Sequence, residues 1–430
     1  MNIDAILAEM LDATTKGYPL SAAAMPISAI GAQQWNVLAG DMPLPLAVIR
    51  DSALAHNHAW MRDFTASTGV LLAPHGKTTM APQIFAQQLA AGAWGITVAN
   101  VQQLGICVRF GVRRVIMANQ LLGAAEVAMV IRLREAHPEL EFHFLLDSLA
   151  QLAAIEAAAA GLTMSRKLTA LVELGVPGGR TGCRTFDEAM TLARAVAASG
   201  IVMLSGLECY EGLQVNGDSA RDMAMVGALM QRVKDVALAC DAEKLFGGTS
   251  IILTAGGSAA FDIVARELPL RLSRPALTIL RSGCYVTHDS GFYDRMLEQV
   301  KSRSGAAWQA RAGLQPALEV WSRVQSCPEP GLAILTMGKR DASFDLDMPV
   351  ASKHYRPGVY TLPHSAPPSW KITGMNDQHA YLSFAAGDAP RVGDLVGCGI
   401  SHPCTTFDKW RALFSVDDDY RVTGAIRTFF

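Results

Sequence analysis

The sequence has almost no net charge. It contains 37 lysine and arginine residues against 39 aspartate and glutamate residues, a formal net charge of −2 over 430 residues. Without a basic excess there is no field to gather nucleic acid, so nucleic acid is not expected as a partner. Charged residues still make up 18% of the chain and hydrophobic residues 50%, which excludes a disordered chain and indicates a globular protein.

Long apolar runs are also missing. The longest stretch without charge, Gly17 to Gly40, is interrupted by prolines, glutamines and an asparagine. A membrane helix needs about 20 mostly apolar residues in a row. The start of the chain places Asp4 and Glu9 inside a helical pattern, where a secretion leader would need a basic start and an apolar core. We therefore expect no membrane association and a cytoplasmic location.

Closely spaced pairs of cysteines are absent too. Without a secretion leader, scattered cysteines are expected to be reduced thiols. Two of them, Cys107 and Cys240, lie in apolar helical runs and are expected in the core. The eight are Cys107, Cys183, Cys209, Cys240, Cys284, Cys327, Cys398 and Cys404.

The middle of the chain alternates short apolar runs with amphipathic, alanine-rich stretches. Strands that alternate with helices predict parallel βαβ units, and eight units over little more than 200 residues predict a closed (β/α)8 TIM barrel. A doubly wound open sheet is the alternative. The expected strands are Val70–Pro74, Ile96–Ala99, Arg114–Ala118, Glu141–Leu146, Leu168–Leu174, Val202–Cys209, Ser250–Thr254 and Thr278–Arg281.

The texture changes after about residue 305. Proline and glycine become frequent, and alternating stretches such as Leu332–Met337 and Tyr420–Arg427 predict a separate β-rich domain. We expect an α/β protein with a barrel over residues 45–305 and a β-rich domain over 306–430. Residues 1–44 are expected to pack on the β domain, because Pro45–Arg50 has the pattern of an extra strand before the barrel.

A lysine follows the first barrel strand, in Pro74-His75-Gly76-Lys77-Thr78. If the strand continues, His75 and Lys77 share a face at its carboxyl end, where barrel enzymes keep their chemistry. A desolvated lysine there could form a Schiff base with an aldehyde. A phosphate-binding P-loop is excluded, because it would need a glycine where the chain has Leu71.

Glycine-rich loops follow the last two predicted strands. They read Gly256-Gly257-Ser258 and Gly283-Cys284-Tyr285. Glycines let backbone N–H groups approach an anion, and these two loops are the usual phosphate site of this barrel. Phosphate at these loops and a lysine on the first strand together suggest pyridoxal 5′-phosphate as the cofactor.

The β-rich region contains His402 and Cys404, two positions apart. In an extended segment both side chains project to one side, and imidazole with thiolate suits zinc. With only two ligands evident, a structural zinc is not expected. An ion with open coordination positions, Zn²⁺ or another divalent metal, suits catalysis.

Together these motifs resemble fold-type III pyridoxal phosphate enzymes of the D-serine dehydratase and D-threonine aldolase group, relatives of alanine racemase with a barrel and a β domain. The resemblance runs from about Pro45 to Asp408. Its motifs here are APHGKTTM, VELGVPGGRTGCR, LECYEG, TAGGS, RSGCY, NDQHAYLSF and SHPCTTFD.

The resemblance implies roles for individual residues. Lys77 would be the Schiff-base lysine and the base at Cα, Arg180 would meet the pyridine nitrogen, and Tyr210 would lie near the cofactor. His402 and Cys404 would bind the metal. The cofactor-binding set would be Lys77, His75, Arg180, Tyr210, Gly256, Gly257, Ser258, Gly283, Cys284 and Tyr285. The family also implies a homodimer.

The implied activity is a dehydratase, or deaminase, that converts a D-serine-like D-3-hydroxyamino acid to a 2-keto acid and ammonia. Cys404 favours this, because the aldolases tend to carry an aspartate at that place. A metal-dependent D-threonine aldolase and a non-catalytic pyridoxal phosphate carrier remain alternatives. Residues 339–347 could bind a substrate carboxylate, line a partner's site or form a solvated turn, and His379 could relay protons or lie at the surface.

Overall fold

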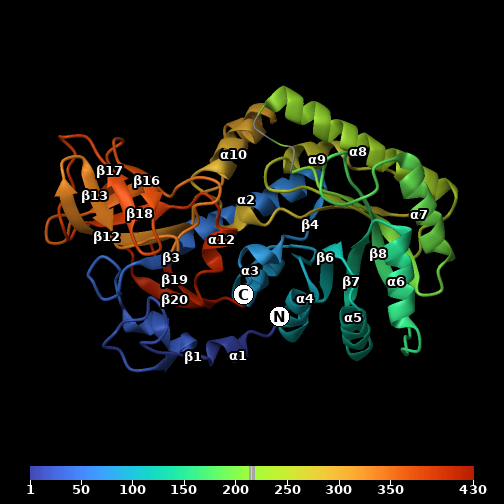
Figure 1. Cartoon of the computed structure of the whole chain (residues 1–430), viewed down its shortest axis with the longest axis horizontal. Coiled ribbons are helices and arrows are strands. Elements are labelled where there is room, and N and C mark those ends of the chain that lie inside the picture. Colours follow the sequence, from blue (N-terminus) through green and yellow to red (C-terminus); the bar gives the residue numbers. More distant parts are fainter. Residues whose placement is uncertain (213–214, 216–217) are drawn as a thin grey trace.

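The computed structural model describes residues 1–212, 215 and 218–430 and consists of two parts that differ in secondary structure. Figure 1 shows a barrel of strands and helices on one side and a β-rich domain on the other, with the N-terminal segment below the β-rich domain. The two parts meet where the carboxyl ends of the barrel strands face the last third of the chain.

The barrel sheet has eight strands, paired side by side in the order β4-β11-β10-β9-β8-β7-β6-β5, and all of these pairs are parallel. The ring closes because His75, just beyond β4, bridges to Thr97 of β5, and the Thr97 N–H donates to the Pro74 carbonyl at 2.9 Å. The predicted closed barrel is thus confirmed over the open sheet. The strands are β4 Leu71–Leu72, β5 Ile96–Val98, β6 Arg114–Gln120, β7 Glu141–Leu146, β8 Leu168–Leu174, β9 Val202–Cys209, β10 Ile251–Ala255 and β11 Ala276–Leu280.

Three strands have the predicted bounds, β7, β8 and β9, because each is an almost continuous run of buried residues. The first strand is shorter than Val70–Pro74. It ends at Leu72, and Pro74 has no N–H to offer a ladder of hydrogen bonds.

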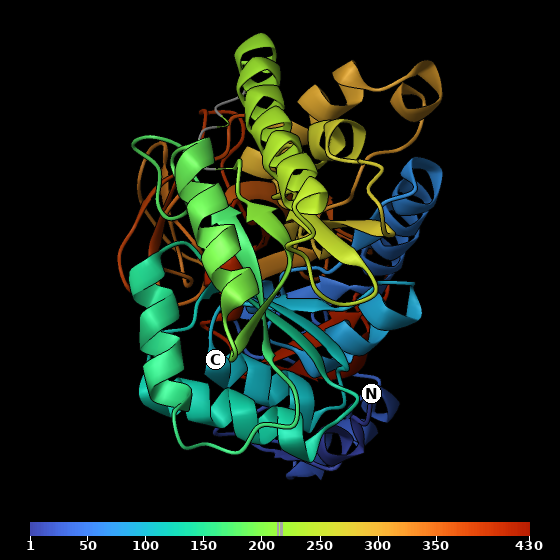
Figure 2. The same cartoon turned by 90° about the vertical axis from the view of Figure 1, so that its right-hand side faces the viewer.

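Helices cover the outside of the barrel (Figure 2). Side-chain caps fix where several begin: Asn100 accepts from the Gln103 N–H before α4, and Thr185 and Glu188 form a capping box at α7. The helices are α2 Asp51–Thr68, α3 Pro82–Ala90, α4 Val101–Arg109, α5 Ala124–Ala136, α6 Leu149–Ala159, α7 Phe186–Ala198, α8 Ser219–Ala242, α9 Phe261–Glu267, α10 Phe292–Arg303 and the short α11 Ala306–Gln309.

The barrel interior is packed with side chains. Ile116, Leu145, Leu171, Ile252 and Ile279, together with Ala73, form a buried cluster of their own. A polar contact joins alternate strands: His143 Nδ1 of β7 lies 2.9 Å from Ser205 Oγ of β9, although β8 runs between these strands. Side chains of alternate strands meet in this way inside a TIM barrel.

The second sheet has ten strands and carries the β-rich domain. Its centre is β12, which pairs antiparallel with β18, β13 and β3. The extra strand expected at Pro45–Arg50 is β3, Leu46–Arg50, which belongs to this sheet and also pairs parallel with β19. The remaining strands are β12 Leu318–Glu329, β13 Leu332–Leu335, β14 Val350–Tyr355, β15 His364–Ser365, β16 Lys371–Met375, β17 Ala380–Ser383, β18 Leu395–Gly399, β19 Ala412–Val416 and β20 Val422–Arg427.

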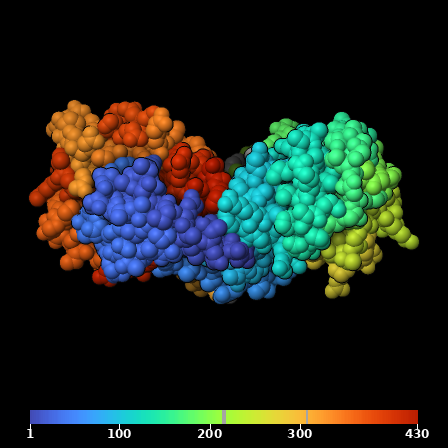
Figure 3. Space-filling view, turned by 90° about the horizontal axis from the view of Figure 1, so that it is seen from below, coloured from blue at the N-terminus to red at the C-terminus, as the bar shows by residue number. Residues whose placement is uncertain are grey.

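The N-terminal segment lies against the β-rich domain, as the space-filling view shows in blue (Figure 3). The Val422 N–H donates to the Trp35 carbonyl at 2.7 Å, and the Val37 N–H donates to the Tyr420 carbonyl at 3.1 Å. The tip of the segment reaches the barrel, where the Asn2 N–H donates to the Phe110 carbonyl. Its elements are α1 Asp4–Leu7, β1 Met10–Leu11, β2 Met25–Pro26 and a 3₁₀ turn Ile27–Gln33.

All eight cysteines are free thiols, and Cys107 and Cys240 are fully buried as expected. Within the part of the chain that the structure describes, no helix combines the length and apolarity needed to cross a bilayer.

Candidate active site at the barrel mouth

Lys77 lies in a 3₁₀ turn, Gly76–Thr78, directly beyond β4. The expectation that His75 and Lys77 share a strand face is wrong, because the strand has already ended. Lys77 is exposed while Gly76 and Thr78 are buried, so the protein's own side chains do not desolvate the amine. The amine is instead open to a ligand that enters the mouth from solvent.

His75 lies among positive charges. Burial lowers the pKa of His75 well below its usual value, and the charges of Lys77, Arg281 and Arg180 lower it further. Its buried Nδ1 has no hydrogen-bond partner within the described residues. A neutral imidazole with an unpaired ring nitrogen, surrounded by three cations, suits a site for a negatively charged ligand with hydrogen-bonding groups.

The two glycine loops meet the lysine turn. A Cβ on Gly283 would lie 2.6 Å from Thr78 Oγ1 and 2.7 Å from the His75 carbonyl oxygen, so only glycine allows this approach. The loops are also joined to each other, because the Cys284 N–H donates to Ser258 Oγ at 3.3 Å and the Ser282 hydroxyl donates to the Gly257 carbonyl at 3.1 Å.

The N–H groups of Gly256 and Gly257 converge on an anion from the same chain. The carboxylate of Glu211 accepts from Gly256 at 3.1 Å and from Gly257 at 2.6 Å. Gly256 has a φ of +93°, a conformation that favours glycine. The predicted anion-binding geometry is therefore present, but these two donors hold Glu211, a residue for which we predicted no role.

Two aromatic residues of the predicted set have different surroundings. The ring of Tyr210 is partly buried, lies 5.3 Å beneath the guanidinium of the exposed Arg180, and would be 2.9 Å from a Cβ on Gly257. Burial raises the pKa of Tyr210 to about 12. Tyr285 is buried with its ring edge-on to His58 of α2, so at this loop it offers its backbone rather than its ring.

A buried ion pair that the sequence did not single out lies beneath the mouth. Arg281 pairs with Glu208 and donates to Thr254 Oγ1 at 2.9 Å and to the Cys209 carbonyl at 3.0 Å. Burial raises the pKa of Glu208 to about 8, although Arg281 opposes the shift. The two residues are 73 positions apart, so no local pattern reveals the pair.

His402 and Cys404 face the barrel from the β-rich domain. They do not lie in an extended segment as expected, because Cys404 begins a short helix, α12 Cys404–Phe407. The two side chains are nevertheless close enough for Cys404 to raise the pKa of His402. Cys404 Sγ also lies 3.4 Å from Thr78 Oγ1, next in sequence to Lys77, and 3.5 Å from Cys284 Sγ. The lysine turn, a glycine loop and the predicted metal pair thus meet at one place.

The charge states of this pair depend on its neighbours. The hydrogen bond from Cys284 is the largest cause that lowers the pKa of Cys404 well below its usual value, and His402 adds to it. Burial alone would lower the pKa of His402, but Cys404 and Asp345 outweigh it and raise the pKa to about 9. Below pH 9 the pair is thus a thiolate beside a protonated imidazole, and a divalent metal would displace that proton to bind both.

The charged loop at residues 339–347 lies against His402, the first residue of the predicted metal pair. His402 Nδ1 lies 2.5 Å from Asp345 Oδ2, and the buried Ser343 accepts from the His402 N–H at 3.3 Å. Asp345 also accepts from Thr405 Oγ1 at 2.8 Å. Across the described ranges, no three His, Cys, Asp or Glu side chains already converge as a metal site. His379 precedes β17 and is exposed, and its backbone carbonyl accepts from the Asn376 N–H at 2.9 Å.

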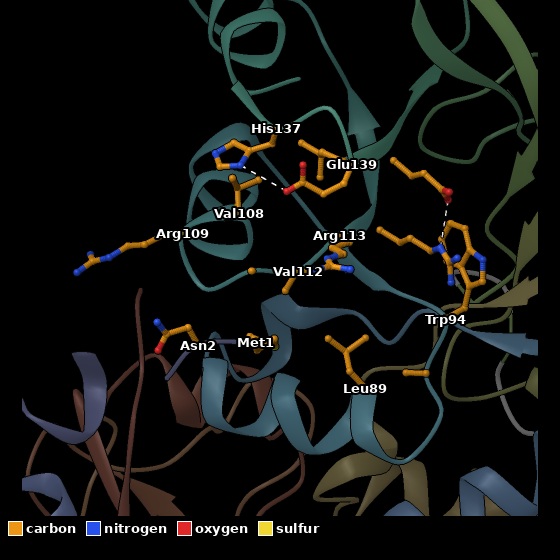
Figure 4. A pocket seen from close by; sticks show the side chains of 15 residues that line it. Met1, Asn2, Leu89, Trp94, Val108, Arg109, Val112, Arg113, His137 and Glu139 are labelled. Atoms are coloured by element: carbon orange, nitrogen blue, oxygen red, sulfur yellow. Dashed lines mark ion pairs between the residues drawn. The ribbon is translucent and has the colours of Figure 1, made fainter. Parts of the chain in front are cut away.

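A surface groove of about 880 Å³ lies at the opposite end of the barrel (Figure 4). Trp94, Arg113 and Glu139 line it, and each comes shortly before β5, β6 or β7 begins. It therefore opens at the amino ends of the strands, away from Lys77, and is not part of the candidate site.

Two family models match the chain in succession. The model of the alanine racemase N-terminal domain matches residues 49–265, half of the chain, and that of a serine dehydratase domain matches residues 317–416. The chain belongs to the alanine racemase N-terminal domain family. It is a fold-type III, pyridoxal-phosphate-dependent enzyme of the lyase type, with a TIM barrel and a β-rich domain.

Curated relatives of this family member cover most of its length. A D-threonine aldolase from Arthrobacter sp. is 25% identical over 81% of this chain and 82% of its own. A D-threo-3-hydroxyaspartate dehydratase from Delftia sp. (strain HT23) is 25% identical over 90% of this chain and 96% of its own.

Solved structures agree on the fold. The D-threonine aldolase from Filomicrobium marinum superposes with a TM-score of 0.71 at 22% identity, over 90% of this chain and 95% of its own. Two structures of D-threo-3-hydroxyaspartate dehydratase are alanine variants of a histidine and of a cysteine two positions further on, and the cysteine variant is in a metal-free form. His402 and Cys404 have the same spacing.

The residues at the mouth fit pyridoxal 5′-phosphate and a divalent metal. Loop N–H groups that already hold a carboxylate suit a phosphate, an accessible lysine amine suits an aldehyde, and the unpaired Nδ1 of His75 suits a polar ring substituent. The imidazole of His402 and the thiolate of Cys404 suit the metal, with coordination positions left for other ligands.

Proposed function

We propose that the protein is a pyridoxal phosphate- and metal-dependent dehydratase that converts a D-3-hydroxyamino acid, D-serine-like in size, to a 2-keto acid and ammonia. The observation that carries this proposal is the contact between Cys404 and Thr78. It places the His402–Cys404 pair beside the turn that contains Lys77.

Lys77 would hold the cofactor, and the loops at Gly256–Ser258 and Gly283–Cys284 would hold its phosphate in place of the Glu211 carboxylate. When bound, the cofactor supplies acidity to the Cα–H bond of the substrate, and the metal supplies Lewis acidity toward the β-hydroxyl. We assign the Cα proton to the amine of Lys77. The amine is exposed at the mouth and lies within its own turn next to Thr78, which contacts the metal pair.

His75 and two arginines would orient the cofactor. Arg180, predicted to meet the pyridine nitrogen, is exposed above Tyr210 and free to turn toward a ligand. Arg281 is held by Glu208, Thr254 and Cys209, so it contributes a fixed positive charge. Because both charges also face His75, that imidazole stays neutral and can accept or donate a hydrogen bond.

His402 and Cys404 would hold the metal where the β-hydroxyl leaves. The oxygen departs with the electron pair of the Cβ–O bond, so a cation at that position lowers the cost of elimination. Asp345 accepts from His402 Nδ1 and leaves the other ring nitrogen for the metal. The histidine–cysteine spacing found in the dehydratase variants supports elimination rather than cleavage of a carbon–carbon bond.

The second candidate is a metal-dependent aldolase that cleaves the Cα–Cβ bond to glycine and an aldehyde. The D-threonine aldolase from Arthrobacter sp. favours it, because its identity to this chain equals that of the dehydratase. The two reactions use the same residues and differ in which bond at Cβ breaks. A non-catalytic carrier of the cofactor would give neither product.

A substrate panel tests the proposal. Purified protein loaded with pyridoxal phosphate and Zn²⁺ is given D- and L-serine, D- and L-threonine and D-3-hydroxyaspartate, and keto acid, ammonia, glycine and aldehyde are measured. We expect keto acid and ammonia in equal amounts from D isomers alone. Glycine with aldehyde would establish the aldolase instead. If no substrate gave a product, the remaining alternative would be a non-catalytic carrier of the cofactor.

Two treatments separate the roles of lysine and metal. Lys77→Ala should abolish both activity and the near-visible absorbance of lysine-bound cofactor, with Lys167→Ala as a matched control outside the mouth. Chelation should remove dehydration but leave that absorbance. Loss of the cofactor on chelation would contradict the role given to the metal.

We also propose that the active form is a homodimer. The support is the family expectation alone, and light scattering coupled to size-exclusion chromatography tests it. A monomer that is fully active at nanomolar concentration would refute the proposed dimer but would not bear on the proposed reaction.

A further inference from the structure

Cys284 faces both halves of the candidate site. Its backbone N–H donates to Ser258 Oγ within the two glycine loops. Its Sγ lies 3.5 Å from Cys404 Sγ. One residue thus joins the loops predicted to bind phosphate to the pair predicted to bind the metal.

The distance between the two sulfurs is close to that in a shared metal site. Two thiolates on one tetrahedral Zn²⁺, each with a Zn–S bond of about 2.3 Å, lie about 3.8 Å apart. The observed 3.5 Å needs only a small adjustment. Cys284 is buried, so its thiol has little access to water and gains from a partner inside the protein.

Cys404 is the shared member of two contacts. Its Sγ lies 3.5 Å from Cys284 Sγ on the barrel side, and His402 stands two positions before it on the side of the β-rich domain. Three side chains that do not yet converge on one point within the described residues are therefore linked through the middle one. The barrel and the β-rich domain each supply part of this cluster.

We propose that Cys284 is a third protein ligand of the metal, so that the centre is Cys284, His402 and Cys404 with one open position. This inference rests on the metal centre of the proposed function. A catalytic zinc typically has three protein ligands and one position for water or substrate, and two ligands alone fall short of that pattern.

Three ligands also make the position of the metal depend on the glycine loop. Gly283 allows the loop to approach His75 and Thr78, and the next residue then places its sulfur against Cys404. A change in the loop would therefore move a metal ligand as well as a phosphate-binding group.

X-ray absorption at the zinc K-edge tests the inference. The measurement uses the full-length protein, reduced with a phosphine and loaded with pyridoxal phosphate and one equivalent of Zn²⁺. We expect two sulfur neighbours in the wild type and one in Cys284→Ser. Competition with a chelator should show that Cys284→Ser lowers the affinity for Zn²⁺ by more than about 100-fold. Loss of a residue that only orients a ligand lowers it by about 10- to 100-fold.

Cys327→Ser is the matched control, since Cys327 is the exposed cysteine and lies in β12 away from the site. It should keep two sulfur neighbours and the wild-type affinity. If Cys284→Ser fails to fold, the count of sulfur neighbours in the wild type still decides.

The outcomes separate this inference from the proposed function. One sulfur neighbour in the wild type, with unchanged Zn²⁺ affinity in Cys284→Ser, overturns the role of Cys284 but leaves the His402–Cys404 centre. Absence of stoichiometric Zn²⁺, together with dehydration that chelators do not affect, overturns the metal centre itself.

Discussion

Asp345 is hydrogen-bonded to one ring nitrogen of His402, with Asp345 Oδ2 2.5 Å from His402 Nδ1. A histidine that binds a metal through one nitrogen is usually oriented through the other by a carboxylate or carbonyl. Asp345 is itself fixed by the hydroxyl of Thr405 at 2.8 Å. If His402 binds the metal as proposed, Asp345 would therefore orient that ligand rather than bind the metal itself.

Asp345→Asn should weaken metal binding without changing the ligands. An amide is a poorer acceptor than a carboxylate, so we expect the affinity for Zn²⁺ to fall about 10- to 100-fold. Chelator competition measures the affinity, and the absorbance of lysine-bound cofactor should stay unchanged. Asp377→Asn, in an exposed pair with Arg340, is the control. Equal affinities in both variants would refute the positioning role.

Gly283→Ala should disturb the mouth. The new methyl group would lie 2.6 Å from Thr78 Oγ1 and 2.7 Å from a backbone oxygen of His75, so the lysine turn must move. We expect weaker binding of pyridoxal phosphate and a loss of about 1–3 kcal/mol in the free energy of unfolding. Gly227→Ala on α8, where a Cβ meets open space, should instead stabilise the protein by about 1 kcal/mol. Denaturant titration and fluorescence of the bound cofactor measure the two effects.

Removing the carboxylate of Glu208 should be costly. Its loss leaves Arg281 as an unpaired buried charge, because both side chains are almost fully buried. We expect Glu208→Ala to lower the free energy of unfolding by about 3–5 kcal/mol. The exposed pair Arg194 and Glu243 provides the control, and Glu243→Ala should cost less than about 1 kcal/mol. Similar losses in the two variants, measured by urea unfolding, would contradict this account.

His143 should make the protein less stable in mild acid. Burial lowers the pKa of His143 to about 4, and the charge of Arg134 adds to the effect. Between pH 6.5 and 4 the unfolded chain binds a proton at this residue more readily than the folded one. The free energy of unfolding is therefore expected to fall by up to about 3 kcal/mol as the pH drops from 6.5 to 4.

His143→Gln should flatten that part of the pH dependence, whatever its effect at neutral pH. Thermal unfolding between pH 4 and 8 gives the slope. The exposed His137, replaced by glutamine, should leave the slope as in the wild type. An unchanged slope in His143→Gln would show that other groups cause the acid sensitivity.

Much of the barrel could be predicted from local patterns. The runs that became β7, β8 and β9 are buried on both faces, which gives continuous apolar stretches with clear ends. The prediction was less exact at the first strand, where the chain turns at Gly76, and at His402 and Cys404, where a helix begins in place of an extended segment. Both deviations lie at the candidate site, where the backbone leaves regular structure.

The contacts that give the site its character could not be predicted in this way. Glu211 lies 45 positions before the Gly256 N–H that it accepts from, and Cys284 lies 120 positions before Cys404. Such pairs depend on how the barrel closes and how the second sheet faces it. Residue types and spacing indicated the chemistry, whereas the partners of each group required the fold.

The position of strand β3 affects the order in which the chain can fold during synthesis. Residues 46–50 lie between β12 and β19, so the sheet of the β-rich domain includes an early segment of the polypeptide. As the chain leaves the ribosome, this apolar strand must wait for more than 250 further residues before its neighbours exist. A gene fragment that starts after Arg50 would lack one strand of that sheet, and a fragment that stops at the end of the barrel would leave an uncovered strand prone to self-association.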